Sequence, residues 1–448
     1  MSDVVHSVVE KDLCSSCGVC AGLCPTDALS MKIQRNGDLT PFVDDSRCHD
    51  NCQLCHDICP FAEGAHNPRR LNTELYSVQP NAKFLEDVGW YTHSIAGFRN
   101  DEKLRSTSAS GGLLTWCLET LLKEGLVRRV AVIRLAKNRD KGFFEFYAAS
   151  AVDELRESSG SIYHPVEISK IIREIGSNRQ ERWAIVGVPC LCAAVRNSQY
   201  LRKVVPFVFG LACGMYQNTF YTEMLLAESG IDRKNVTKIE YRIKSNDSPP
   251  SDYRFRGTDN LRQGKEIAYH GLPCYLGENA FFRLNACNFC MDVFAETADA
   301  CFMDAWLPEY VSDRSGTSLV LIRNPAIQHI MEQGSHEQTV TLNEIEIQRV
   351  IASQMGHVRR KRYLIQMRQG KKMDPSTGQA FTIHDKLAWL VQHYVQQRSK
   401  LAWHATGRLK GCQSFWRAIW DVSVLINMEA LFNKTLGRAL CLMARLRR

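Results

Sequence analysis

Two short cysteine motifs near the start of the chain constrain its fold more than any other feature. The first motif consists of Cys14, Cys17, Cys20 and Cys24, four thiols within eleven residues. The second consists of Cys48, Cys52, Cys55 and Cys59. A proline follows each final cysteine. Thiols gathered this closely in a reducing environment bind metal or carry redox chemistry more often than they cross-link.

The spacing matches the bacterial ferredoxin pattern C-x2-C-x2-C-x3-C-P. In that pattern three cysteines of one motif bind one [4Fe-4S] cluster and the fourth binds the other cluster. The sequence therefore predicts one cluster on Cys14, Cys17, Cys20 and Cys59, and another on Cys48, Cys52, Cys55 and Cys24. One departure weakens the second set, because three residues instead of two separate Cys48 from Cys52. Paired zinc knuckles are the alternative, but zinc ligands usually come as two pairs across a longer loop.

The residues around these motifs support a ferredoxin-like repeat. Ser15, Gly18 and Gly22 are small enough for the backbone to wrap closely around an inorganic core. Between the motifs, residues 28–45 predict two short strands around a turn at Asn36-Gly37.

Length and composition indicate a globular protein of two or three domains. The chain has 448 residues, of which 45% are hydrophobic and 23% are charged. The first residues lack the basic and apolar regions of a secretory signal, so we expect a cytoplasmic location, where the 18 cysteines stay reduced. No uncharged apolar run reaches the roughly 18 residues that a membrane-spanning helix needs.

A Ser/Gly-rich turn follows a polar segment that we predict to be a linker, residues 66–85. The turn, Ser106–Gly112, leads into a segment with helical spacing, with Gly125 placed as its C-terminal cap. Small residues before a helix N-terminus leave its amides open to a phosphate or a flavin edge. A capped structural helix would have the same sequence.

Further cysteines follow predicted strands. An apolar run over residues 183–188 and a Gly-x-Pro-Cys turn put Cys190 at the carboxyl end of a strand, where α/β sheets bind ligands. A second apolar strand ends at Cys213, and Cys287 and Cys290 form a C-x2-C pair. Cysteine is also a common core residue. That role is expected for Cys117, Cys274, Cys412 and Cys441.

Several of these motifs occur together, in the same order, in one known family. They are SASGG, SGSIYHP, GVPC, FGLAC, CNFCMDVFAETADACFMD and GTSLVLIRN. From about Cys14 to Arg323 the chain resembles the beta subunit of coenzyme F420-reducing hydrogenase and its relatives. The relatives include formate dehydrogenase beta subunits and 7-hydroxymethyl chlorophyll a reductase.

The resemblance implies FAD in an α/β core, with iron–sulfur clusters that feed or drain it. The candidate flavin contacts that it implies are Ser108, Ser110, Gly111 and Gly112. The candidate ligands that it implies for a third [4Fe-4S] cluster are Cys190, Cys213, Cys287 and Cys290. Either Cys192 or Cys301 could replace one of them.

Two departures from the family pattern bear on the substrate. The family often has Cys-His-Gly where this chain has Cys213-Gly214-Met215, so a polar side chain near the cluster is missing. A glycine often precedes the aspartate that ends the last motif, whereas Met303 precedes Asp304 here. Both changes favour a substrate other than the deazaflavin coenzyme.

The C-terminal region is basic and predicted to be mostly helical. Residues 358–372 are rich in Lys and Arg, and residues 407–448 alternate apolar clusters with arginines around Trp416 and Trp420. Such helices could contact an anionic membrane surface, dock an acidic partner such as ferredoxin, or simply form a solvated face. No nucleic-acid-binding module is recognisable, so nucleic acid is an unlikely partner.

Together these observations predict an α+β protein in three parts. They are a two-cluster ferredoxin-like domain at 1–67, an FAD and iron–sulfur core at 68–330, and a basic helical region at 331–448. The predicted function is an iron–sulfur flavoprotein reductase that passes electrons from a ferredoxin-like donor to an organic substrate. The alternative is a coenzyme F420-linked hydrogenase or dehydrogenase beta subunit that transfers electrons within a larger complex. We expect it in the cytoplasm, with peripheral contact at the inner membrane as an option. No catalytic residue is assigned. The nearest proton-donor candidates are Tyr163 and His164, although a core tyrosine–histidine pair is the favoured explanation for them.

Overall fold

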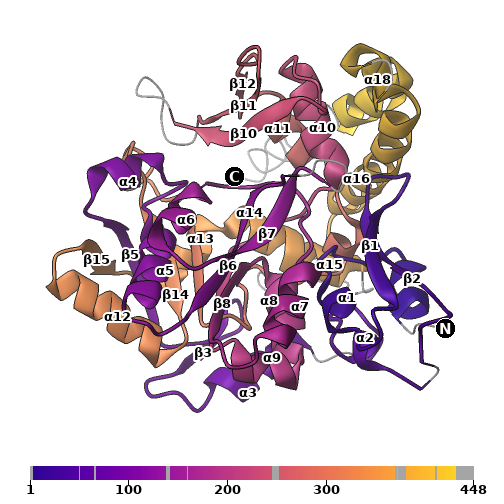
Figure 1. The fold of residues 1–448 in the computed structure, drawn as a ribbon. Coiled ribbons are helices and arrows are strands. Elements are labelled where there is room, and N and C mark those ends of the chain that lie inside the picture. The colour runs from indigo at the N-terminus through magenta and orange to yellow at the C-terminus, as the bar shows by residue number, and fades with distance from the viewer. Residues whose placement is uncertain are drawn as a thin grey trace.

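A computed structural model describes residues 4–49, 51–64, 67–137, 142–158, 160–244, 252–368, 371, 380–408 and 411–429. The N-terminal region contains the two cysteine motifs and a hairpin between them (Figure 1). Its elements are η1 (Val5–Val9), α1 (Val19–Leu23), β1 (Leu29–Ile33), β2 (Leu39–Val43) and α2 (Leu54–Asp57). Strands β1 and β2 pair antiparallel, with Ile33 opposite Leu39, and Gly37 in the turn has a φ of 85°. The predicted hairpin is confirmed.

An eight-stranded mixed sheet forms the centre of the molecule, in the order β15-β5-β14-β13-β9-β8-β6-β7. Its strands are β5 (His93–Arg99), β6 (Arg129–Leu135), β7 (Phe144–Ala149), β8 (Trp183–Gly187), β9 (Phe207–Leu211), β13 (Ala300–Asp304), β14 (Ser318–Ile322) and β15 (Val340–Glu344). Strands β13, β9, β8 and β6 run parallel, and antiparallel strands flank them on both sides. The carboxyl ends of the four parallel strands therefore meet at one edge.

Helices cover both faces of this sheet (Figure 1). Those within the central region are α4 (Glu102–Thr107), α5 (Leu113–Lys123), α6 (Val152–Glu157), α7 (Ser169–Ser177), α8 (Pro189–Asn197), α9 (Gln199–Val204) and α12 (Pro325–His336). Alternate residues of a strand point to opposite faces. In β14, Val320 packs in one core with α5 and α12, whereas Leu319 packs in the other core with α7 and α8. The result is a three-layer α/β/α arrangement.

The segment predicted to be a linker is instead folded. It contains α3 (Pro68–Tyr76) and β3 (Lys83–Leu85), and β3 pairs with β4 (Gly89–Tyr91). The Asn67 side chain accepts a hydrogen bond from the Arg69 amide, and Pro68 occupies the first helical turn. Asparagine followed by proline is a helix-start signal, which the polar composition of this segment obscured.

A smaller layer lies beside the central sheet, at the top of Figure 1. It consists of α10 (Thr219–Glu228), β10 (Val236–Ile243), β11 (Arg254–Asp259), β12 (Ile267–Ala268) and α11 (Leu272–Glu278). Strands β10, β11 and β12 form an antiparallel sheet. The turn η3 (Asn285–Asn288) follows and carries Cys287.

The described part of the C-terminal region is mostly helical and packs on the rest of the protein. It contains α13 (Ile347–Ser353), α14 (Met355–Val358), η4 (Arg359–Tyr363), α15 (Leu364–Arg368), α16 (Ile383–Ala402), η5 (Trp403–Gly407) and α18 (Cys412–Ala418). Phe415 is fully buried against Phe282 and Trp403, and Trp416 packs on Tyr275. Trp420 is exposed, and residues 430–448, with Cys441, lie outside the described residues.

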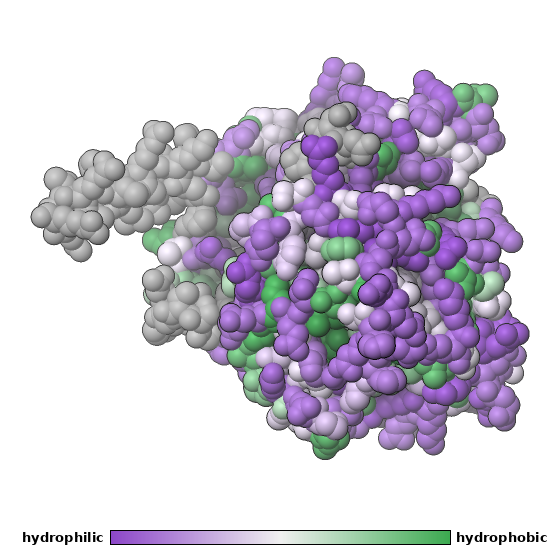
Figure 2. All heavy atoms as spheres, turned by 90° about the vertical axis from the view of Figure 1, so that its left-hand side faces the viewer, coloured by the Kyte–Doolittle hydropathy of each residue, from purple (hydrophilic) through white to green (hydrophobic). Residues whose placement is uncertain are grey.

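The predicted boundary at residue 330 falls inside α12, and β15 beyond it pairs with β5 of the central sheet. The three-part division stays a prediction. Figure 2 shows a mostly hydrophilic surface on the side of α4 and α12, where hydrophobic residues show mainly near the middle of the face. Within the described ranges, none of the helices combines the length and apolar character that crossing a bilayer requires.

Candidate functional site

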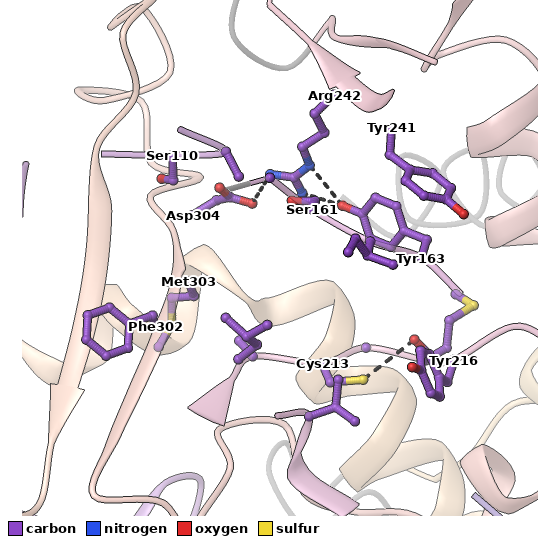
Figure 3. A pocket seen from close by; sticks show the side chains of 18 of the residues that line it. Ser110, Ser161, Tyr163, Cys213, Tyr216, Tyr241, Arg242, Phe302, Met303 and Asp304 are labelled. Atoms are coloured by element: carbon purple, nitrogen blue, oxygen red, sulfur yellow. Dashed lines mark hydrogen bonds and ion pairs between the residues drawn. The ribbon is translucent and has the colours of Figure 1, made fainter. Parts of the chain in front are cut away.

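A cavity of about 720 Å³ opens at the sheet edge where the parallel strands end. Its wall includes Cys190 after β8, Cys213 after β9, and Asp304 at the end of β13. Ser110, from the turn before α5, lies across the cavity from Cys213 (Figure 3). This volume is in the usual range of cofactor and substrate sites, roughly 300–1,000 Å³.

Three of the four predicted flavin contacts line this cavity: Ser108, Ser110 and Gly112. Gly111 lies behind them, and its amide donates a 3.0 Å hydrogen bond to Ser318 Oγ. Gly112 is the N-cap residue of α5, with a φ of 80° and no side-chain hydrogen bond to the helix. The first amides of α5 therefore have no side-chain acceptor at the end of the helix that adjoins the cavity. The turn can therefore approach a ligand with backbone alone.

The structure brings the N-terminal thiols together in two sets. Burial raises the pKa of the Cys20 thiol, and the nearby thiols of Cys17, Cys14 and Cys59 raise it further. The other set, Cys24, Cys48, Cys52 and Cys55, lines one small cavity. Each set combines three thiols of one motif with the last thiol of the other. The sets are neighbours, because Cys55 also acts on Cys20.

A third set of thiols forms beside the large cavity. Burial raises the pKa of Cys190, and Cys290, Cys17, Cys213 and Cys287 contribute in the same direction. The Tyr216 amide donates a 3.3 Å hydrogen bond to Cys287 Sγ. Cys17 belongs to the first N-terminal set, so the third set lies next to it.

The two alternative cluster ligands named from the sequence, Cys192 and Cys301, lie in different surroundings. Cys192 is fully buried in α8, and its thiol donates to Gly187 O at 3.5 Å and to Phe209 O at 3.8 Å. Cys301 is buried within β13 and packs in the sheet core. Neither lines the cavity. The core thiols that act on Cys190 are those of Cys213, Cys287 and Cys290, so these four form the coherent set.

A single metal ion and an iron–sulfur cube require different ligand spacings. Among the described residues, no three His, Cys, Asp or Glu side chains converge closely enough to hold one metal ion. A zinc ion binds its ligands at about 2.3 Å, so its four thiolates nearly touch. An iron–sulfur cube places several atoms between its ligands.

The polar wall of the cavity centres on Arg242, which sequence reasoning did not identify. Its guanidinium pairs with Asp304 at 2.7 Å and donates to Tyr163 Oη at 2.5 and 2.9 Å (Figure 3). Lys244 comes directly after β10, two residues beyond Arg242. It donates to Ser315 O at 2.7 Å and to Ser110 O at 3.4 Å. Burial lowers the pKa of Lys244 to about 8. Lys244 therefore anchors the Ser110 turn, and Arg242 presents positive charge to the cavity.

The two proton-donor candidates have different surroundings. Tyr163 lines the cavity, where Arg242 holds its hydroxyl. His164 is 1% exposed, and its Nδ1 lies 2.8 Å from Thr222 Oγ1 within an aromatic cluster. Burial lowers the pKa of His164 to about 3. His164 is thus a core histidine, and it does not reach the cavity.

The loop after Cys290 is held by buried charges. Arg323 is fully buried and donates to the carbonyl oxygens of Val88, Trp90, Phe294, Ala295 and Ala298. Glu296 pairs with Arg69 and with Arg362, both at 2.5 Å. These contacts fix the path of the chain between the C-x2-C pair and β13.

Two charges of the basic run 358–372 face inward. Lys361 is 2% exposed, and Arg362 is buried against Glu296. Burial disfavours the ammonium group, but the thiols of Cys290, Cys213 and Cys287 outweigh it and raise the pKa of Lys361. Arg359, by contrast, is 66% exposed. Positive charges that look like a surface patch in the sequence are instead neighbours of the core thiols.

The same segment fills the position where a polar side chain was judged missing. A Cβ on Gly214 would lie 2.2 Å from Nδ1 of His357, which lines the cavity. Residue 214 is therefore glycine because an imidazole from α14 occupies its side-chain space. Burial, with Arg360 and Lys361 nearby, lowers the pKa of His357 to about 4. No sequence signal links positions 143 residues apart.

Two curated relatives match much of the chain at low identity. One is the coenzyme F420-dependent sulfite reductase of Methanocaldococcus jannaschii, 21% identical over 76% of this chain and 49% of the relative. Another is one of the subunits of the F(420)H(2) dehydrogenase of Methanosarcina mazei, 22% identical over 54% of this chain and 65% of the relative. The chain thus spans about half of the first relative and less than two thirds of the second.

Two further similarities come from hydrogenases. The beta subunit of the coenzyme F420 hydrogenase of Methanothermobacter thermautotrophicus is 23% identical over 55% of this chain and 82% of that relative. A chain of the F420-reducing [NiFe] hydrogenase complex of Methanosarcina barkeri gives a TM-score of 0.49 at 15% identity, over 67% of this chain and 98% of that one.

Family sequence models match three parts of the chain. Residues 7–30 match a 4Fe-4S binding domain. Residues 94–173 match the N-terminal part of the coenzyme F420 hydrogenase/dehydrogenase beta subunit, and residues 180–348 match its C-terminal part. The two beta-subunit models together cover more than half of the sequence, and so the chain belongs to the family of coenzyme F420 hydrogenase/dehydrogenase beta subunits.

Proposed function

We propose that this chain is the iron–sulfur electron-transfer subunit of an oxidoreductase linked to coenzyme F420. Its relatives are named as an F420-dependent sulfite reductase, an F(420)H(2) dehydrogenase subunit and a coenzyme F420 hydrogenase subunit. Its N-terminal segment matches a 4Fe-4S binding domain. This was the alternative interpretation of the sequence, and the comparisons favour it over the ferredoxin-driven reductase. One of the two departures that argued against the deazaflavin carries less weight, because His357 supplies a polar side chain beside Gly214.

The order of the thiol sets supports an electron path into the cavity. Cys55 of one N-terminal set neighbours Cys20 of the other, and Cys17 of that set neighbours Cys190 of the core. Cys190 and Cys213 in turn line the cavity. We assign one [4Fe-4S] cluster to each set, with the ligands given above. The observation that carries the proposal is this series of neighbouring thiol sets from the ferredoxin-like region to the cavity.

We assign FAD to the cavity, with its edge against Ser108, Ser110 and Gly112. A flavin exchanges electrons singly with clusters and in pairs with an organic coenzyme. The volume, the open N-terminus of α5 and the absence of a side chain at Gly112 fit such a group. Arg242, fixed by Asp304 and Tyr163, is placed to bind a polar or anionic part of the ligand. Its partner in the cell is another subunit of the same oxidoreductase.

The first test is the composition of protein purified without oxygen. It should be brown, contain about eight to twelve irons per chain and release FAD on denaturation. Cys213→Ser should lose about four irons, while Cys117→Ser, at a buried cysteine of α5 away from the cavity, should lose none. Colourless protein with stoichiometric zinc would refute the proposal.

The second test compares electron donors. Reduced coenzyme F420 and reduced ferredoxin are offered separately while the FAD absorbance is followed. The proposal expects rapid flavin reduction by the coenzyme. Reduction by ferredoxin alone, with none by the coenzyme, would restore the ferredoxin-driven reductase as the better reading.

A further inference from the structure

A buried ammonium group lies directly against the core thiols. Lys361 Nζ is 3.2 Å from Cys290 Sγ and 2.7 Å from Asp292 O. Its side chain is 2% exposed, so water contributes little to its solvation. The lysine comes from η4, beyond residue 348 where the family match ends. It is a feature of this chain's C-terminal segment.

The neighbourhood holds Lys361 in place, with the carboxylate of Asp292 facing its charge. The adjacent Arg362 is occupied by Glu296 at 2.5 Å. The groups that face the ammonium electrostatically are the thiols of Cys290, Cys213 and Cys287 and the carboxylate of Asp292. The ammonium group of Lys361 therefore acts electrostatically on three of the four assigned core ligands.

A cluster ligated by thiolates is anionic, and reduction adds one further negative charge. Net charge and hydrogen bonds to sulfur are among the properties that set its reduction potential. A fixed cation at hydrogen-bond distance from a ligand sulfur stabilises the reduced form more than the oxidised form, because the interaction grows with the negative charge it faces. Burial strengthens this effect by excluding water.

We propose that Lys361 raises the reduction potential of the core cluster, so that electrons collect beside the cavity instead of in the N-terminal clusters. The inference rests on the proposed function, since it requires a cluster on the core thiols. Lys361 acts through that cluster and need not touch the substrate. The C-terminal segment then has a redox role in addition to packing against the loop after Cys290.

The test is a potentiometric titration of protein purified without oxygen, followed by electron paramagnetic resonance. The core signal is identified as the one that Cys213→Ser lacks. Lys361→Gln keeps a donor for Asp292 O and removes the charge, so the core potential should shift downward while the N-terminal clusters stay unchanged. Lys361→Arg should remain close to wild type. Arg359→Gln removes the same charge from an exposed site two residues away and should shift nothing.

Asp292→Asn provides an independent variant with the opposite sign. It removes a negative charge that faces the same site, so the core potential should rise. If Lys361→Gln keeps its core cluster and its potential, the inference is wrong. If Lys361→Gln loses the core cluster, the Asp292→Asn variant decides. A core potential that does not rise in Asp292→Asn overturns the inference. A wild-type protein without the Cys213-dependent signal would refute the proposed function itself.

Discussion

Gly111 and Gly112 give the turn before α5 a shape that side chains do not permit. A Cβ on Gly111 would lie 2.6 Å from Gly97 O and 2.8 Å from Ser318 N, both backbone atoms that cannot swing aside. Gly112 has a φ of 80°, in the left-handed region. The turn therefore packs flat against β5 and β14 while its other side faces the cavity.

Gly111→Ala should push the turn away from the sheet. We expect a loss of about 1–3 kcal/mol in the free energy of unfolding, as in other overpacked cores, together with loss of bound flavin. Urea unfolding and flavin content measure the two effects. Gly125→Ala is the control at the other end of α5, because its Cβ would meet no atom within 4 Å. Unlike Gly111, Gly125 has a positive φ, so alanine there costs some stability for a backbone reason. The Gly125→Ala protein should keep its flavin. A Gly111→Ala protein with normal stability and flavin would contradict this account of the turn.

The buried His164 makes stability depend on pH. Its pKa is lowered from 6.5 to about 3, so below pH 6.5 the unfolded chain binds a proton that the folded chain rejects until pH about 3. The free energy of unfolding therefore falls as the pH drops through this window. Between about pH 7.5 and 5.5 the contribution of this one histidine is about 1.4 kcal/mol.

His164→Gln should retain much of the contact with Thr222 and lose this pH dependence. Urea unfolding at the two pH values should show a smaller acid loss in the variant than in the wild type, by about 1.4 kcal/mol. The pKa of His357 is also lowered, so the free energy of unfolding keeps some dependence on pH in both proteins. Equal acid losses in variant and wild type would show that His164 is not the group responsible.

At this scale the sequence indicated some site residues and could not indicate others. Cysteine spacing pointed to the two N-terminal thiol sets because ligands of a cluster recur at short, regular intervals. Arg242 and Lys361 carry no such signal, since their partners Asp304 and Cys290 lie 62 and 71 residues away in the chain. Only the folded sheet edge brings them together.

Among the elements, the loop between Cys290 and β13 is the one most dependent on buried charge. Arg323 binds five of the surrounding carbonyl oxygens, and Glu296 neutralises Arg69 and Arg362. Removing one member of a buried ion pair leaves the other charge without compensation. The loop positions two of the assigned core ligands, so its stability and the core cluster should be coupled.

Glu296→Gln should cost about 3 kcal/mol of stability and reduce the iron content. Glu86→Gln is its control, because Glu86 contacts the same Arg69 at 3.4 Å but is 83% exposed. A surface change of that kind should stay within about 0.5 kcal/mol of wild type. Anaerobic urea unfolding and iron analysis give both readouts. Equal behaviour of the two variants would mean that the pairs around Glu296 do not hold the loop.

Elements with a strong local pattern were predictable. The hairpin around Asn36-Gly37 and the helix from Leu113 to its cap at Gly125 follow directly from turn residues and apolar spacing. Helix α3 was missed because its buried face is narrow, only Leu71, Asn72 and Tyr76. The sequence could not place Lys361 and Arg362 of the basic run, because charge density alone does not show which side chains turn inward.

In the whole molecule, the ferredoxin-like region is fastened to the core at several points. The Ile168 amide donates to Cys17 O at 2.9 Å, and Arg173 pairs with Asp27 at 2.7 Å. On the other side, the buried Lys400 of α16 pairs with Asp38 at 2.8 Å. These contacts place Cys17 beside Cys190. The sequence predicted the separate thiol sets, but their relative placement depends on long-range contacts that no motif encodes.

In the proposed electron path, electrons pass between the cavity and the N-terminal clusters through the core thiols. The most direct measurement titrates anaerobic wild type and Cys213→Ser with reduced coenzyme F420, following flavin absorbance and the cluster resonance signals together. In the wild type, flavin and clusters should both be reduced. In the variant, the flavin should still be reduced while the N-terminal clusters stay oxidised. N-terminal clusters that are reduced equally fast in the variant, or a wild type that stays oxidised with the coenzyme, would contradict the account.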